Sequence, residues 1–317
     1  MERMLAIVLV ITSATLCLAD KIAYWSCDQQ NPAVAATTLA PWYLVEEVSD
    51  ANGIMQNKTS GPPATTAMKF VTSGAGIRGD YGNALTTNNL NDCVKFEGLT
   101  ALNLGQADFT VTGWFNSLNS ARHGCVINHG SWDNGGFSIL ILKNGHSQAG
   151  KLLFQIYGNI LGSNKDTTVS DRVVCDGKWH WFAGVVKDQT IYLYIDGKLQ
   201  QSSGQTVYDG GTTATATAAV PVTYINYDMA ATVDEISVFD TAVTAQVDGG
   251  NNLVGGELLK LWQNVMPQDV TDCAKAVEFG YRIAGDFNLD CSFDMIDMVA
   301  IANNWLVNND PAYVSVQ

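Results

Sequence analysis

The segment DGKWHWFAGVVKDQTIYLYIDGKL, residues 176–199, carries the strongest structural signals in the chain. Its runs WHWFAGVV and TIYLYI are rich in aromatic and β-branched residues, which is typical of β-strands. Asp196 and Gly197 form a pair that favours a tight turn between antiparallel strands, because Gly197 permits a positive φ. The segment therefore predicts neighbouring strands that are closed by a hairpin.

The same strand-like pattern of residues extends from Asp20 to about Leu261. Short apolar or alternating runs such as FTVTGWF, KLLFQIYG and VDEISVFD recur between Gly, Asn and Asp residues. Alternation with a period of two indicates strands with one buried and one wet face. Asn144-Gly145 is a second hairpin signal. Ten or more strands without intervening helices predict a mainly β sandwich or jelly roll.

Length and charge narrow the functional classes. The chain has 317 residues, enough for one large or two modest domains, and its formal net charge is −14. Nucleic-acid binding requires Lys and Arg against phosphates, so a chain this acidic is not expected to have a nucleic-acid partner.

The first 19 residues are expected to be a signal peptide. The apolar run from Leu5 to Leu18 is shorter than the ~20 residues that a spanning helix needs, and the small residue Ala19 suits cleavage before Asp20. A membrane anchor is the alternative. No later segment reaches transmembrane length, so we expect a protein that is secreted or held at the cell surface.

The cysteine count agrees with export. Once Cys17 is removed with the signal peptide, six cysteines remain, and an even number in an exported protein indicates disulfides. Six cysteines allow 15 connectivities. Chain separation favours Cys273 with Cys291, and the pairs Cys27 with Cys93 and Cys125 with Cys175 are our hypothesis for the rest.

The order of the β segments resembles the LamG-like, concanavalin A-like jelly-roll domains. The resemblance rests on GDYGNAL (79–85), VKFEG (94–98), ADFTVTGWF (107–115), the 176–199 segment and ATVDEISVFDTAVT (231–244). It covers roughly residues 20–261 and implies two stacked sheets. The large apolar side chains expected to fill the layer between these sheets are Trp114, Trp179, Trp181, Phe182 and Tyr194.

The sequence offers little for catalysis. Related glucanase folds carry two carboxylates spelled E-x-D-x-x-E, whose spacing puts the outer pair on one sheet face, and this motif is missing here. Asp234 and Glu235 are adjacent, so a regular strand would place them on opposite faces, and we expect them to bond backbone amides. His180 is interpreted as a core or half-buried histidine. A glycoside hydrolase or lyase of the same fold remains an alternative function.

Ligand binding is the preferred hypothesis. Sandwiches resembling this one bind sugars on a concave sheet face or at rim loops. The loop NHGSWDNGGF, residues 128–137, combines aromatic and polar side chains between glycines, and such loops are frequent binding sites. Its candidate ligand-binding residues are His129, Trp132, Asp133 and Asn134. The competing interpretation is a solvated hairpin loop with Trp132 folded onto the core.

A twelve-residue acidic loop near the C-terminus has the spacing of a calcium site. Its oxygen-bearing side chains fall at positions 1, 3, 5, 7, 9 and 12, namely Asp286, Asn288, Asp290, Ser292, Asp294 and Asp297. Such crowded carboxylates repel one another unless a cation lies among them, so Ca²⁺ is the predicted cofactor. The stretch DMIDMVAIANNWL that follows has helical spacing of its apolar residues.

The stretch AGDFNLDCSFDMIDMVAIANNWL, residues 284–306, resembles a dockerin with an F-hand loop. Only one copy of the repeat is present, Cys291 stands where Gly usually makes the turn, and Met295 and Ile296 replace the small hydroxyl residues that recognise a cohesin. The resemblance implies a half-dockerin over residues 272–317, after a linker at 262–271, that anchors or caps. A cohesin-like or scaffold partner is the alternative.

Three functions compete on the sequence. The first is a secreted, non-catalytic surface protein that binds an extracellular glycan or protein ligand and has a calcium-stabilised tail. The second is a glycan-cleaving enzyme of the same fold. The third is a structural component of an extracellular or cell-surface assembly.

Overall fold

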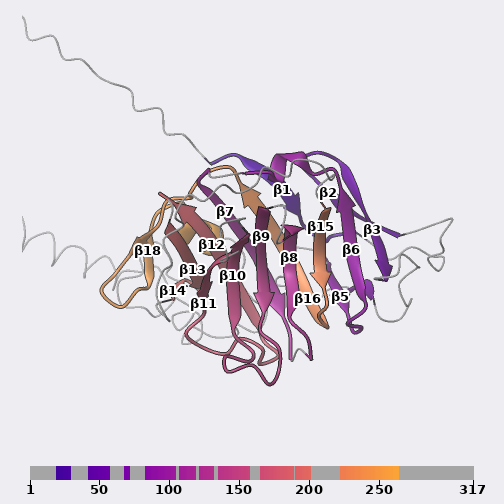
Figure 1. The fold of residues 1–317 in the computed structure, drawn as a ribbon. Coiled ribbons are helices and arrows are strands. Elements are labelled where there is room, and N and C mark those ends of the chain that lie inside the picture. The colour runs from indigo at the N-terminus through magenta and orange to yellow at the C-terminus, as the bar shows by residue number, and fades with distance from the viewer. Residues whose placement is uncertain are drawn as a thin grey trace, which may run out of the picture.

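The computed structural model describes residues 19–29, 42–57, 68–71, 83–104, 107–118, 121–131, 135–157, 165–188, 190–200 and 222–263. These residues form two stacked antiparallel sheets, which confirms the prediction of a mainly β sandwich (Figure 1). The predicted signal cleavage site borders this range at Ala19, and the predicted calcium loop lies outside it.

Sheet A contains eight strands. In spatial order they are β14 (Lys198–Leu199), β13 (Thr190–Ile195), β12 (Trp179–Lys187), β7 (Phe109–Asn116), β16 (Ala231–Phe239), β5 (Ala84–Thr87) and β4 (Met68–Val71), with β1 (Lys21–Trp25) also paired to β16. The register across β12 and β7 sets Trp181 opposite Trp114 and Phe182 opposite Gly113.

Sheet B also contains eight strands and faces the viewer in Figure 1. In spatial order they are β11 (Lys165–Val169), β10 (Leu152–Tyr157), β9 (Gly135–Ile141), β8 (Gly124–Ser131), β15 (Val222–Tyr227), β6 (Asp92–Glu97), β3 (Ala51–Asn57) and β2 (Trp42–Glu46). Four short elements complete the described structure: η1 (Thr100–Leu102), β17 (Gln246–Val247), β18 (Leu253–Gly255) and the helix α1 (Glu257–Gln263).

The two predicted hairpins both occur, with different connections. Asp196 and Gly197 join β13 to β14 with positive φ angles of 47° and 72°, which is the geometry of a tight two-residue turn. Asn144 and Gly145 lie between the paired strands β9 and β10, in a broader connection over residues 142–151.

The main core fills the layer between the sheets. Sheet A contributes Val111, Phe115 and Phe182, and sheet B contributes Phe96 and Phe154, all fully or almost fully buried. Phe182 therefore lies where the sequence predicted it.

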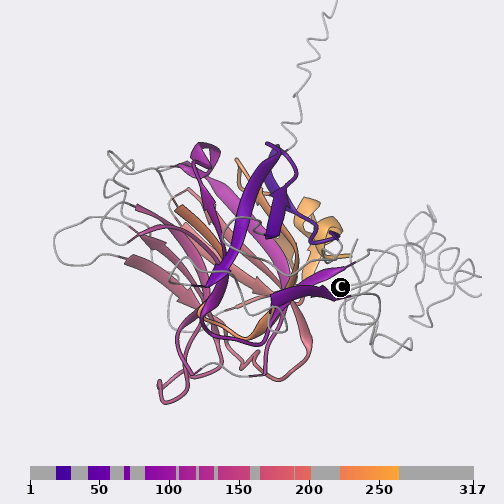
Figure 2. The ribbon, with the colours of Figure 1, turned by 90° about the vertical axis from the view of Figure 1, so that its right-hand side faces the viewer.

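The outer face of sheet A holds a second core, which the sequence did not predict. Trp114, Trp181 and Tyr194 are buried there against Trp262 of α1, and Trp179 packs beside them. Figure 2 shows α1 on the side of the sandwich opposite to the face seen in Figure 1. Trp114, Trp179, Trp181 and Tyr194 were expected to fill the inter-sheet layer, and this expectation was wrong. Neighbours along a strand alternate between faces, and the chain returns to cover the second face. Trp262 falls in the predicted linker, yet it is only 2% exposed.

The four described cysteines are not joined by disulfides. Cys27 belongs to the core between the sheets, whereas Cys93 precedes the core residue Val94 and so lies on the other face of sheet B. Cys125 belongs to a small cluster on that outer face, and Cys175 packs against the main core. The hypothesised pairs Cys27–Cys93 and Cys125–Cys175 therefore do not form in this structure. Cys273 and Cys291 lie outside the described residues.

Within the part of the chain that the structure describes, no helix is long and apolar enough to cross a membrane.

Candidate functional site

The outer face of sheet B carries polar and aromatic side chains that strand alternation turns away from the core. On β10, Phe154 and Ile156 enter the main core, so Gln155 and Tyr157 lie on the outer face. On β15 the core residue is Ile225, which places Tyr224 outside. The same alternation holds on β6, where Lys95 lies between two core residues.

Strand register aligns these outward residues into one line across the whole sheet. Each is directly opposite the next: Tyr43, Ile54, Lys95, Tyr224, Asn128, Ser138, Gln155 and Thr167. We call this line the cross-strand row. Seven intervals of about 4.8 Å between neighbouring strands give it a length of about 34 Å. A ligand that follows the row would run perpendicular to the strands.

Exposure varies along the cross-strand row. Tyr43 is 45% exposed and Ile54 40%, while Tyr224 and Asn128 are half-buried. Ser138 and Gln155 are buried, and Thr167 at the far end is again half-buried. The side-chain Nε2 of Gln155 has no hydrogen-bond acceptor, and a buried donor without an acceptor is costly.

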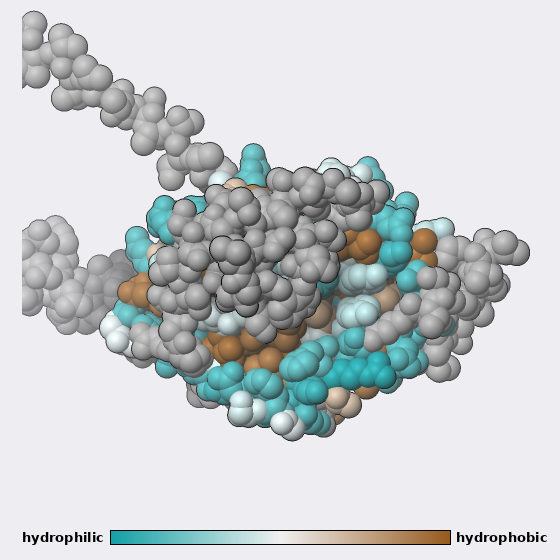
Figure 3. All heavy atoms as spheres, viewed as in Figure 1, coloured by the Kyte–Doolittle hydropathy of each residue, from teal (hydrophilic) through white to brown (hydrophobic). Residues whose placement is uncertain are grey.

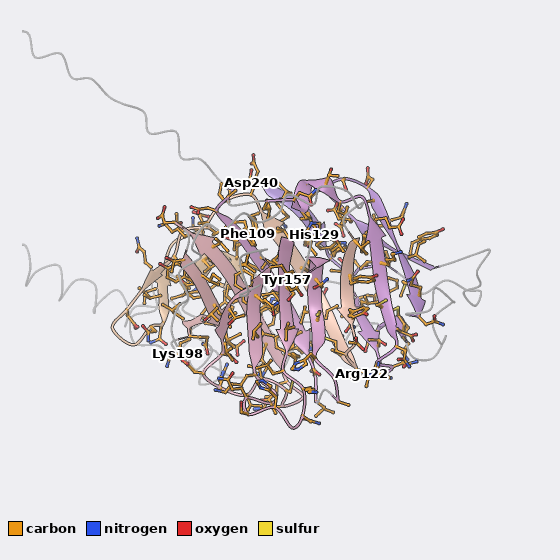
Figure 4. All side chains as sticks on the ribbon, in the orientation of Figure 1. Phe109, Arg122, His129, Tyr157, Lys198 and Asp240 are labelled. Atoms are coloured by element: carbon orange, nitrogen blue, oxygen red, sulfur yellow. The ribbon has the colours of Figure 1, made fainter. Side chains whose placement is uncertain are left out.

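Tyr157 organises the buried part of this face. Its hydroxyl donates to Asn128 Oδ1 at 2.8 Å and lies 3.2 Å from Ser138 Oγ. Burial raises the pKa of Tyr157 to about 12, so its hydroxyl stays protonated at neutral pH and remains a donor. Figure 4 shows Tyr157 near the middle of this face and His129 toward its upper rim.

The aromatic and charged groups of the face are also arranged in pairs. The rings of Tyr224 and Tyr227 lie 4.7 Å apart at an angle of 43°, and Lys95 forms an ion pair with Glu97 at 2.6 Å. Figure 3 shows hydrophobic surface bordered by hydrophilic residues where the described part of this face is visible. The row itself contains no Asp or Glu, so it does not supply the paired carboxylates of glycoside hydrolysis.

His129, the one described residue among the four predicted ligand-binding residues, does not face this surface. It is 2% exposed, and its ring nitrogens contact Thr223 Oγ1 at 2.8 Å and Asn103 Oδ1 at 3.1 Å. Burial lowers the pKa of His129 to about 4, so it is neutral. Its side chain serves packing and is not open to a ligand. Trp132, Asp133 and Asn134 lie outside the described residues.

His180 is a buried histidine, as the sequence predicted, and it lies between two carboxylates. Nδ1 is 2.7 Å from Asp196 Oδ2, Nε2 is 3.0 Å from Asp176 Oδ1, and Arg172 also pairs with Asp196. Burial alone would lower the pKa of His180, but the hydrogen bonds and charges of the two aspartates outweigh burial and raise it. This group ties the 176–180 segment to the β13–β14 turn.

Asp234 and Glu235 lie at a bulge in β16, where the register against β7 shifts. Asp234 Oδ1 accepts from the backbone N–H of Glu235 at 2.9 Å, as expected. Glu235 instead accepts from the Tyr24 hydroxyl at 2.7 Å, and burial raises the pKa of Glu235. Glu235 therefore links β1 to β16, whereas Asp234 supports the bulge within β16.

The cross-strand row was not predicted from the sequence. Alternation within a stretch such as KLLFQIYG identifies Gln155 and Tyr157 as residues of one face. It does not show which residues of the seven other strands lie in line with Gln155, because that depends on register between segments far apart in the chain.

Several solved structures resemble this chain at low sequence identity. Similar solved structures include domain 4 of AbnA, a GH43 extracellular arabinanase from Geobacillus stearothermophilus, in complex with arabinotriose, at 15% identity and a TM-score of 0.48 over 71% of this chain and 95% of that one. A structure of botulinum neurotoxin type C, whose cell entry depends on two ganglioside molecules, has 14% identity and a TM-score of 0.48 over 80% of this chain and 53% of that one. The binding domain of Paraclostridial Mosquitocidal Protein 1 has 15% identity and a TM-score of 0.45 over 63% of this chain and 47% of that one. The chain therefore spans about half the length of the last two proteins.

Curated protein sequences gave no match. Residues 82–247, more than half of the chain, match the sequence family described as the concanavalin A-like lectin/glucanases superfamily. The matched range contains most of both sheets and six residues of the cross-strand row, from Lys95 to Thr167 and Tyr224. The chain belongs to the concanavalin A-like lectin/glucanases superfamily.

Proposed function

We propose that this protein binds an extended, uncharged glycan along the cross-strand row of sheet B. The observation that carries the proposal is the open part of the row, where the exposed or half-buried Tyr43, Lys95, Tyr224 and Asn128 are aligned in register. Tyrosine rings offer apolar faces for sugar rings. Amide and hydroxyl groups both donate and accept, as the hydroxyls of a sugar require.

Charge favours a neutral ligand. Lys95 is the only charged residue in the row, and Glu97 neutralises it on the same face. The chain as a whole carries a net charge of −14, which would repel an anionic polymer. Because the row has no carboxylates, binding without hydrolysis is the activity that it supports.

The test is glycan affinity of the Tyr224→Ala variant. Loss of one aromatic stacking contact, about 0.5–1.5 kcal/mol, should weaken binding about two- to tenfold. Isothermal titration calorimetry against neutral β-glucan, xylan and arabinan oligosaccharides measures it. The matched control is Tyr192→Ala, on the outer face of sheet A, which should leave affinity unchanged.

Two results would contradict the proposal. Equal loss in both variants would show that Tyr224 matters only for folding. Release of reducing ends, abolished by changing a single carboxylate, would make the protein a glycan-cleaving enzyme.

We also propose that the chain is exported and that the 286–297 loop binds Ca²⁺. The proposal rests on the apolar N-terminal run and on the spacing of the acidic residues. Calcium, relative to a chelator, should raise the melting temperature of a transition in the full chain, and the Asp286→Asn variant should lose this shift. A calorimetric profile that does not change with calcium would rule out the metal loop.

A further inference from the structure

A pocket of about 300 Å³ lies at the rim of the sandwich, beside β1, the end of β2 and η1. Its volume is at the lower end of the range for small-molecule sites. Most of its walls are small or aliphatic: Ile22, Ala23, Ala51, Leu99, Ala101 and Leu102. Its polar lining comes from Glu46, Ser49, Glu97 and Thr100.

Glu46 is the buried charge of this pocket. Its side chain is 1% exposed, and it accepts hydrogen bonds from the backbone N–H groups of Tyr24 at 2.7 Å, Val48 at 2.9 Å and Ser49 at 2.9 Å. The Ser49 hydroxyl also donates to it. These four donors fix the carboxylate in position, but they carry no net charge.

No cation compensates Glu46 among the described residues. Lys95 pairs with Glu97 at 2.6 Å, and the Lys21 ammonium lies 3.6 Å from the centre of the Tyr24 ring. No described Lys, Arg or His lines the pocket. Buried charges in proteins are normally paired, and Glu46 lines the same cavity as the aliphatic residues, so a positive group bound there would lie near its carboxylate.

We propose that this pocket binds a primary alkylammonium group, supplied by a free amine or by a lysine side chain. The aliphatic walls would enclose the methylene chain, and the ammonium would lie in the field of Glu46. This site is separate from the cross-strand row, so its test does not depend on the glycan proposal.

The experiment is an NMR titration of the full chain with pentylamine and, as its neutral counterpart, pentanol. Pentylammonium should bind at least tenfold more tightly, shift the amides of residues 22–23, 46–51 and 97–102, and weaken as salt is raised. Nα-acetyl-lysine methylamide, titrated in parallel, distinguishes a lysine side chain from a free amine as the preferred source.

Two variants complete the design. Ala101→Trp places a large ring at an exposed position of the pocket wall and should weaken pentylammonium binding at least tenfold. Ala107 is also exposed but lies outside the pocket, so Ala107→Trp is the control and should leave pentylammonium binding unchanged. Equal binding of pentanol, unchanged affinity in Ala101→Trp, or equal losses in both variants would each overturn the proposal.

Discussion

Replacing Trp262 by alanine tests whether α1 is an integral part of the sandwich. Trp262 is 2% exposed, and its ring lies 6.4 Å from that of Trp181 on the outer face of sheet A. Truncating a buried aromatic residue to alanine costs about 3–5 kcal/mol. In a domain of this size each kcal/mol lowers the melting temperature by about 2–4 °C, so we expect a fall of about 6–20 °C.

Gly197 makes the test sharper, because it faces the same ring. A Cβ at Gly197 would lie 2.0 Å from Trp262 Cζ3, so Gly197→Ala forces the two elements apart. Its φ of +72° also costs an L-residue about 1–2 kcal/mol, whatever the space. In the Trp262→Ala background the overlap disappears and only this backbone strain remains. The double variant should therefore be more stable than the sum of the single effects predicts, by about 0.5–3 kcal/mol.

Urea denaturation followed by circular dichroism measures all four members of the cycle. Glu257→Ala is the matched control, since the side chain of this residue is 46% exposed on the same helix and pairs with the exposed Lys260. It should change the unfolding free energy by less than about 0.5 kcal/mol. A loss below about 1 kcal/mol for Trp262→Ala, or strict additivity with Gly197→Ala, would refute the packing of α1 on sheet A.

Three further changes test other parts of the sandwich. The carboxylate neighbours of His180 raise its pKa, so protonated His180 stabilises the fold. This stability is fully present below the ordinary pKa of 6.5 and is lost as pH rises through the raised value. The unfolding free energy of the wild type should therefore fall over that pH range, and that of His180→Asn should fall less. Gly53→Ala should destabilise by about 1–3 kcal/mol, since its Cβ would lie 2.3 Å from an aromatic ring of β6, whereas Gly249→Ala, with nothing within 4 Å, should be nearly neutral in the same denaturation assay. Thr110→Val removes the acceptor of the Val243 amide, so that amide should exchange hydrogen faster and stability should fall by about 1–3 kcal/mol.

The strands and one tight turn could be predicted because their signals are local. Asp196-Gly197 determines its turn through the conformations that two adjacent residues can adopt. Alternation likewise predicts that Trp181 and Phe182 face opposite sides of β12. It does not predict that Trp181 is also buried, because its cover comes from Trp262, 81 positions further along the chain. The second core therefore depends on a long-range contact that a local pattern does not contain.

The candidate site shows the same limit. His129 was predicted to bind a ligand because it lies beside Gly130 and near polar residues. Strand alternation instead turns its ring toward the core, where the centre of the Phe137 ring is 5.8 Å from its own. Asn128, its neighbour, faces outward and joins the cross-strand row. A shift of register by one residue would exchange the two faces, so pairing with β9 and β15 decides which of the two is available to a ligand.

The unequal cover of the two sheets explains where binding is expected. Thr110 of β7 donates to the Thr241 carbonyl at 3.0 Å and accepts from Val243 N–H at 2.9 Å, which holds the segment after β16 against sheet A. Leu253, Leu258 and Trp262 then bury the outer face of that sheet in an apolar cluster. The outer face of sheet B carries only a smaller apolar cluster around Leu140 and Leu153, beside tyrosine, amide and hydroxyl groups, and at Gln155 it has a buried donor without an acceptor. The larger apolar cluster stabilises the fold on one side, so the hydrogen-bonding capacity that a glycan needs is concentrated on the other.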